Sequence, residues 1–146
     1  MTTLTSPDQV AGEYIETSGR LLQQADAEFE RGDLLQASEK AWGAVSQYLK
    51  AMATQRGLPH RVHRELRLVA NDLVEETGQQ RIRELFAIAE SMHANYYEAW
   101  MPEAEVRAGV VNVRELLDIL KAIPRPEGTP EQLVRQRTFF RDRGDG

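Results

Sequence analysis

Apolar residues recur every three or four positions along most of the chain, which is the spacing of one face of an amphipathic helix. Five such segments lie between residues that commonly start or end helices. We expect helices over about residues 7–31, 34–56, 59–77, 79–101 and 102–123. No stretch alternates between apolar and polar residues for long enough to predict a strand.

Short turns separate these five segments. Gly32, Gly57 and Gly78 each follow a periodic segment, and Pro124 comes directly after the fifth. Glycine after a helix and proline beyond its end are the usual stop signals. Antiparallel helices joined by short turns pack as bundles. The fold class that we predict is therefore all-α, an antiparallel bundle of about five helices that forms one domain over residues 1–123.

Residues 124–146 differ in composition from the bundle. Pro124, Pro126, Gly128 and Pro130 are typical of a linker, and one short helix could follow them through Phe140. Two interpretations of this C-terminal tail stay open: a frayed, flexible end, or an arm that docks on a partner subunit. In the second case, the apolar side chains available for docking include Phe139 and Phe140.

Composition narrows the chemistry that is available. The 146 residues carry a formal net charge of −5, which argues against a general polyanion binder, and they include no cysteine. Disulfides, thiolate zinc sites and cysteine nucleophiles are thereby excluded. The longest apolar run covers residues 85–89, whereas a membrane span needs about 20 residues. With no signal peptide pattern at the start, we expect a cytoplasmic protein without a membrane segment.

Basic residues gather around the start of the predicted third helix despite the acidic total. A helix N-terminus attracts anions, and arginine can bind phosphate through two hydrogen bonds. The ligand-binding candidates here are His60, Arg61, Arg64 and Arg67. The alternative is a solvated face whose arginines pair with acidic residues of other helices.

A second polar and aromatic stretch follows His93. Asn95 and Tyr97 are further ligand-binding candidates, although a histidine on an apolar helix face often serves only packing. Tyr96 and Trp100, together with the tail phenylalanines, are candidates for a subunit interface, because amphipathic aromatic rings are common there. Glu90 and His93 form one Glu-x-x-His step, but a di-iron bundle needs two. We therefore expect neither a metal nor another cofactor.

Two motifs resemble a known family. Residues 32–44 (GDLLQASEKAWGA) and 92–100 (MHANYYEAW) are similar in order and spacing to the signatures of the archaeal PaREP family, a branch of the HEPN superfamily. The resemblance implies a small helical bundle that forms homodimers. It also implies action in RNA cleavage or as the partner of a minimal nucleotidyltransferase.

Catalytic HEPN proteins carry an arginine followed, after four to six residues, by a histidine. In this chain only Arg56 and His63 have that spacing, and no arginine precedes His93 in the same way. We therefore predict a homodimer that binds RNA or a nucleotide with little or no catalysis. Two alternatives stay open: a metal-independent endoribonuclease that uses Arg56, His63 or His93, and a purely structural partner of another protein.

Overall fold

A computed structural model describes residues 6–144 of the chain, and the side chains of residues 6–137. Within that range the protein is all-α, as predicted, and contains no strand. The helices are α1 (Pro7–Glu30), α2 (Leu34–Arg56), α3 (His63–Thr77), α4 (Arg81–Glu98), α5 (Glu103–Ala122) and α6 (Pro130–Gly144). No helix in the described range is long and apolar enough to span a bilayer.

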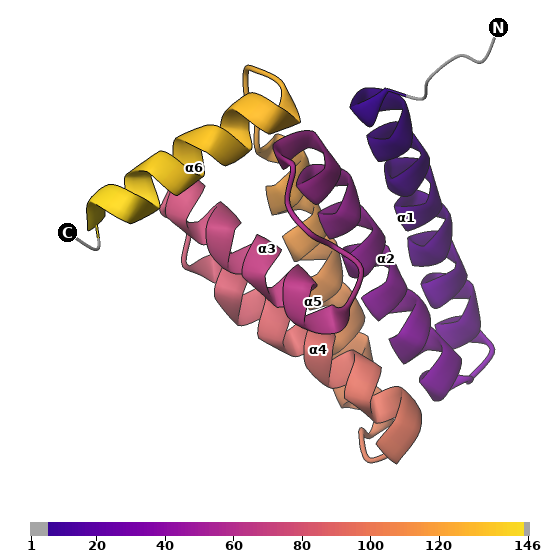
Figure 1. Ribbon diagram of the computed structural model, residues 1–146. Coiled ribbons are helices and arrows are strands. Elements are labelled where there is room, and N and C mark those ends of the chain that lie inside the picture. The colour runs from indigo at the N-terminus through magenta and orange to yellow at the C-terminus, as the bar shows by residue number, and fades with distance from the viewer. Residues whose placement is uncertain (1–5, 145–146) are drawn as a thin grey trace, which may run out of the picture.

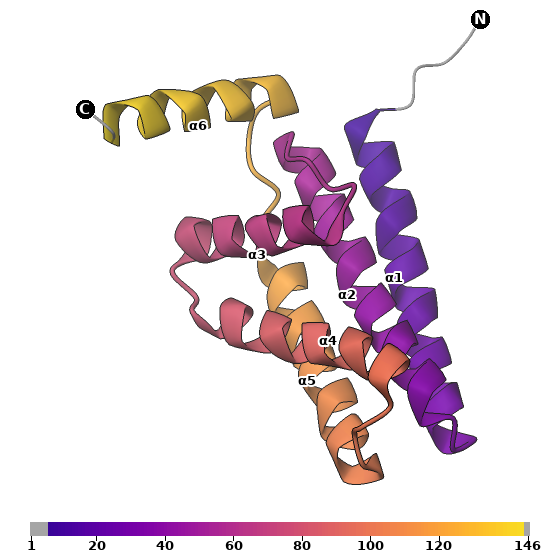
Figure 2. The same ribbon diagram turned by 60° about the horizontal axis from the view of Figure 1, so that its bottom comes forward.

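The central element of the bundle is α2, which touches every other helix. It forms a long antiparallel hairpin with α1, while α4 and α5 pack on its other side (Figure 1). Ala41, Ala44 and Val45 are fully buried, so small side chains on α2 let its neighbours approach closely. Figure 2 shows α6 extending away from one end of the bundle, next to the end of α2.

The cap residues fix where the first two helices begin and end. Ser6 and Gln9 exchange hydrogen bonds in a capping box at the start of α1. Asp33 accepts a hydrogen bond from the Gln36 amide at the start of α2. Gly57 ends α2 with a φ of 70°, and a Cβ there would lie 2.8 Å from the carbonyl oxygen of Pro130. Glycine is thus required both by the left-handed backbone and by the close approach of α6.

The third helix begins at His63, four residues later than its expected start at Pro59. The Glu65 carboxylate accepts hydrogen bonds from the amides of Arg61 and Val62. These bonds satisfy backbone donors at the true N-terminus, and residues 58–62 form an irregular connection that bends at residues 61–62.

The fourth helix ends at Glu98, earlier than the expected Met101. Ala99 adopts a left-handed conformation with a φ of 54°, which stops the helix. The Asn95 side chain accepts hydrogen bonds from the amides of Trp100 and Met101, and so stabilises the turn after Ala99. A buried side-chain cap therefore replaces the proline as the stop signal here.

Candidate functional site

Three rings from three helices meet on one side of α2. The Trp42 ring lies 4.8 Å from the ring of His63 on α3 and 5.2 Å from that of His93 on α4, measured between centroids. The two imidazole centroids are 5.6 Å apart. Trp42 is 6% exposed and forms the floor, whereas the side chains of His63 and His93 are 40% and 27% exposed. We call these three residues the histidine–tryptophan cluster.

Each histidine of the cluster is held by a carboxylate from another helix. His63 Nε2 lies 2.7 Å from Glu90 Oε2, and His93 Nδ1 lies 2.9 Å from Glu39 Oε2. An ionised carboxylate can only accept, so these two ring nitrogens carry the donating protons. His63 Nδ1 and His93 Nε2 make no hydrogen bond within the described residues. One nitrogen of each ring is therefore available to a ligand.

A cation and an exposed aromatic ring extend the cluster. Arg67 donates a hydrogen bond to the same Glu90 oxygen that His63 uses. Tyr97 packs edge-on against His93 at 5.4 Å and is 72% exposed, and Tyr96 packs edge-on against Tyr97. The surroundings of the two histidines thus offer hydrogen-bonding groups, positive charge and a free aromatic face.

The basic residues around the start of α3 divide into three groups. Arg61 and Arg64 are exposed, and neither side chain forms an ion pair with a described residue. Arg67 and His63 converge on α4, as described above. His60 is directed elsewhere, since its Nδ1 lies 2.9 Å from the Leu58 carbonyl oxygen and its ring packs against Tyr14 of α1.

Arg56, a weak catalytic candidate from the sequence, is buried. Its Nε and Nη2 atoms donate to the two Glu76 carboxylate oxygens at 3.0 and 2.9 Å, and Nη1 donates to the Met52 carbonyl oxygen at 3.2 Å. Its guanidinium therefore connects α2 to the end of α3. In this arrangement Arg56 has a structural role, and His63 has His93 as its neighbour instead.

Asn95, a ligand-binding candidate, is also buried. Its amide donates to Ser38 Oγ at 3.0 Å, and its carbonyl oxygen caps the turn after α4. Of the interface candidates, Trp100 is exposed and Tyr96 half-buried. Phe139 and Phe140 belong to α6, but their side chains lie outside the described residues.

The sequence did not single out Glu39 as a partner of His93. A signal was present, because Glu39 lies three residues before Trp42 and so shares its helix face. From the sequence, Glu90 was considered only as part of the Glu-x-x-His step with His93, whereas in the fold its carboxylate is hydrogen-bonded to His63. Across the described part of the chain, no three histidine or acidic residues are grouped so that they could hold a metal ion.

Comparisons with known proteins support this fold. A crystal structure of a protein from Sulfolobus solfataricus matches with a TM-score of 0.64 and 21% identity, over 71% of this chain and 92% of that one. At this identity the match shows the fold alone. A comparison with curated proteins finds no match. The model of the archaeal PaREP1/PaREP8 family matches residues 13–117, which include both motifs and the whole histidine–tryptophan cluster, so the chain belongs to this family.

Proposed function

We propose that the chain is an RNA- or nucleotide-binding module whose site is the histidine–tryptophan cluster and the first turns of α3. The observation that carries the proposal is the position of two exposed guanidinium groups, those of Arg61 and Arg64, on either side of His63 along the chain, with no ion pair to any described residue. Arginine binds phosphate oxygens, and an exposed tyrosine such as Tyr97 can stack on a base.

Charge and exposure support this assignment. The net charge of −5 leaves most of the surface unattractive to a polyanion, so binding is expected only where cations gather. Arg67 adds a third cation, although Glu90 partly neutralises it. The unused imidazole nitrogens could donate or accept hydrogen bonds at the same place. We therefore expect modest, salt-sensitive affinity confined to one face.

The test is fluorescence anisotropy of a labelled single-stranded RNA at several salt concentrations. Replacing Arg61 and Arg64 with alanine should weaken binding and reduce the slope of log K against log salt by about 1.4, which is 0.7 for each lost phosphate contact. The matched control replaces Arg20 and Arg31, two exposed arginines of the α1 hairpin, and should leave the slope unchanged. Equal slopes in both double variants would contradict the proposal.

Tyr97→Ala is the complementary variant. Loss of one stacked base is expected to weaken RNA binding by about fivefold to a hundredfold. Because Tyr97 is largely exposed, the fold should persist, which circular dichroism can check. A Tyr97→Phe variant retains the ring and should bind like the wild type. Loss of binding in both variants would argue against stacking.

A second candidate function is metal-independent cleavage of RNA, favoured by the two imidazoles held 5.6 Å apart by carboxylates. One neutral imidazole would remove the proton from a ribose 2′-hydroxyl, whose oxygen then attacks phosphorus. The other, protonated, would give its proton to the leaving 5′-oxygen. The products are a 2′,3′-cyclic phosphate and a 5′-hydroxyl. This candidate also agrees with the HEPN resemblance.

Cleavage and binding can be separated by experiment. If the imidazoles catalyse, His63→Gln and His93→Gln should each slow the formation of cyclic phosphate by about a hundredfold or more in the presence of a chelator. RNA affinity should change far less. RNA binding without formation of any cyclic phosphate would support the binding function and contradict the nuclease function.

We also propose that the module acts as a homodimer. Trp100 exposes aromatic surface just beyond the end of α4, where a second subunit could cover it. Sedimentation equilibrium at micromolar concentration should show a dimer that Trp100→Ala weakens. A monomeric wild type would contradict this part of the proposal without affecting the binding test.

A further inference from the structure

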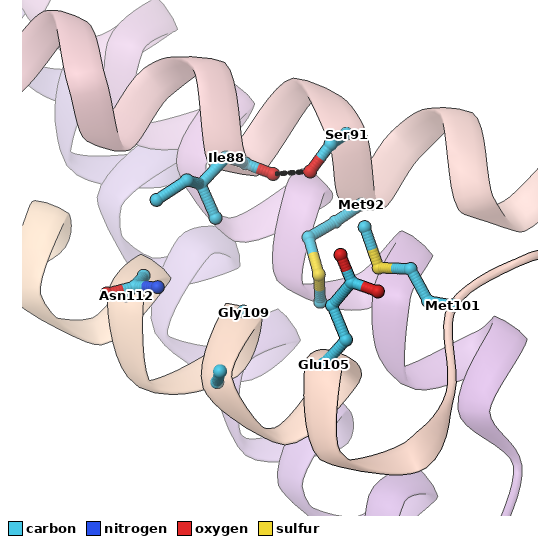
Figure 3. A pocket seen from close by; sticks show the side chains of 8 residues that line it. Ile88, Ser91, Met92, Met101, Glu105, Gly109 and Asn112 are labelled. Atoms are coloured by element: carbon cyan, nitrogen blue, oxygen red, sulfur yellow. Dashed lines mark hydrogen bonds between the residues drawn. The ribbon is translucent and has the colours of Figure 1, made fainter.

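A small pocket lies between α4 and α5, and none of its lining residues belongs to the histidine–tryptophan cluster. Its volume is about 170 Å³. Figure 3 shows Ile88 and Met92 directed from α4 toward α5, with Glu105 and Asn112 on α5 at the two ends of the pocket. Met101, from the loop before α5, lies on the Glu105 side.

The pocket exists because α5 presents almost no side chain at its centre. Ala108 and Gly109 line this part. A Cβ on Gly109 would lie 2.2 Å from the Met92 sulfur, so the buried Met92 side chain occupies the space that any larger residue would need. The result is a thioether floor with open space above Ala108, which is itself exposed.

The polar groups around this apolar floor include hydrogen-bond acceptors that the fold leaves unused. Glu105 is exposed and has no ion pair or side-chain hydrogen bond within the described residues, unlike Glu103 and Glu115 on the same helix, which pair with arginines. Ser91 Oγ donates to the Ile88 carbonyl oxygen and keeps its lone pairs. No lysine, arginine or histidine lines the pocket. An unneutralised carboxylate next to apolar surface is suited to a cation that carries an apolar part.

We propose that this pocket binds a small organic cation, an alkylammonium or alkylguanidinium with a short apolar stem. A cavity of about 150 Å³ accommodates benzene, so the pocket has room for roughly six to eight non-hydrogen atoms. The stem would lie on the partly exposed Ile88 and Met101 side chains, above the buried Met92 thioether, and the cationic head would reach the Glu105 carboxylate. The Asn112 side chain makes no hydrogen bond within the described residues, and its oxygen offers a second acceptor for the head.

The methionine methyl groups provide a direct readout. The chain has four methionines, of which Met92 and Met101 line the pocket and Met52 is buried within α2. In protein labelled with ¹³C at the methionine methyls, butylammonium and butylguanidinium at millimolar concentration should shift the Met92 and Met101 signals. The Met52 signal should stay in place. Equal shifts with butanol or butyrate would overturn the assignment of charge, and no shift with any probe would overturn the site.

Three variants sharpen this test. Glu105→Gln should weaken butylammonium binding about fivefold, the size expected for a partly exposed ion pair. Ala108→Leu should fill the pocket and abolish the shifts. Glu103→Gln removes the same charge from the same turn of α5 and should leave the affinity within twofold of the wild type. Equal losses in the two glutamine variants would show a general charge effect and overturn the proposal.

The source of the cation can be distinguished in the same titration. A lysine-containing peptide of neutral flanking sequence serves as the comparison. We expect the free amines to bind more tightly than the peptide, because the pocket is small and lies between two helices. Tighter binding of the peptide would overturn the small-molecule assignment in favour of a partner's side chain.

Discussion

Two polar groupings contact α2, and they differ in how much of their hydrogen-bonding capacity the fold uses. At the end of α2, three guanidinium nitrogens of Arg56 donate to Glu76 and Met52, and the arginine side chain is 1% exposed. Beside the middle of α2, the histidines of the histidine–tryptophan cluster are partly exposed, and each forms a hydrogen bond through one ring nitrogen only. The first grouping has little left to offer a ligand, while the second retains that capacity.

Burial explains the difference. A buried polar group must find its partners within the protein, because leaving it unpaired costs about 1–3 kcal/mol and more for a charge. Among the described residues, every buried side-chain nitrogen and oxygen has a partner. A partly exposed group is satisfied by water and can exchange that water for a ligand. Unused hydrogen-bonding groups at a half-buried surface are therefore a better guide to a binding site than residue type.

The largest expected effect concerns the buried grouping around Arg56. Arg56→Ala should lower the free energy of unfolding by about 3–5 kcal/mol, because it opens a cavity in place of a fully buried side chain and removes the hydrogen bonds to Glu76 and Met52. Urea denaturation followed by circular dichroism measures the change. Arg31→Ala, which removes an exposed arginine paired with Glu28, should cost less than about 1 kcal/mol. A similar cost in both variants would contradict the structural role of Arg56.

Asn95→Ala is expected to have the next largest effect and to lower the free energy of unfolding by about 2 kcal/mol. It removes one buried donor and the acceptor of two backbone amides. The amides of Trp100 and Met101 should then exchange faster with solvent, which hydrogen exchange can show. Ser38→Ala removes the acceptor of the Asn95 amide and the hydrogen bond that Ser38 donates to the Leu34 carbonyl oxygen, but it leaves the cap of Trp100 and Met101 in place, so it should cost about half as much. If Ser38→Ala proved the more damaging, the cap at the end of α4 would not be the main role of Asn95.

The helices could be predicted because each carries its own periodic pattern and stop signals. Gly57 and Gly78, for example, mark the ends of α2 and α3 in the sequence and in the structure. The start of α3 and the end of α4 could not be predicted as well. They depend on the Glu65 and Asn95 side chains returning to cap the backbone, and a proline nearby gave a stronger local signal than either of them.

The candidate site was predicted only in part. The sequence singled out His63 and His93, but it assigned them to different groups because 30 positions separate them. Only the packing of α3 and α4 on Trp42 brings the two rings together. Arg56 illustrates the opposite case, since its spacing before His63 matches a catalytic pattern while the fold directs its side chain to Glu76. Spacing along the chain cannot show which side of a turn each residue faces.

A smaller effect is expected at Asp72, which is neither fully buried like Arg56 nor as exposed as His63. Its ionisation should make the free energy of unfolding depend on pH. Burial raises the pKa of this α3 carboxyl; the Arg137 cation of α6 opposes that rise, while the nearby Glu75 and Glu76 add to it. Because the pKa in the folded state exceeds that in the unfolded chain, the contribution of Asp72 to stability falls as pH rises through the raised pKa. Relative to Asp72→Asn, the wild type should lose less than about 1 kcal/mol over this range.

Arg137→Ala provides the control for this pH dependence. Without the opposing cation the pKa of Asp72 should rise further, so the loss of stability should extend to higher pH. Urea denaturation between about pH 3 and pH 7 follows both effects. A wild type that gains stability relative to Asp72→Asn as pH rises would show that the ion pair outweighs burial.

The smallest expected effect concerns the partly exposed histidine–tryptophan cluster. Glu39→Gln retains an oxygen that can accept from His93 but removes the charge, and because both side chains are partly exposed the cost should be below about 1 kcal/mol. The ¹H–¹⁵N spectrum of the imidazoles should nevertheless change at His93 and stay the same at His63, which Glu90 holds independently. A loss of stability as large as that of Arg56→Ala would mean that the cluster is a structural element. Partial exposure of its histidines would then not distinguish a binding site from a structural contact.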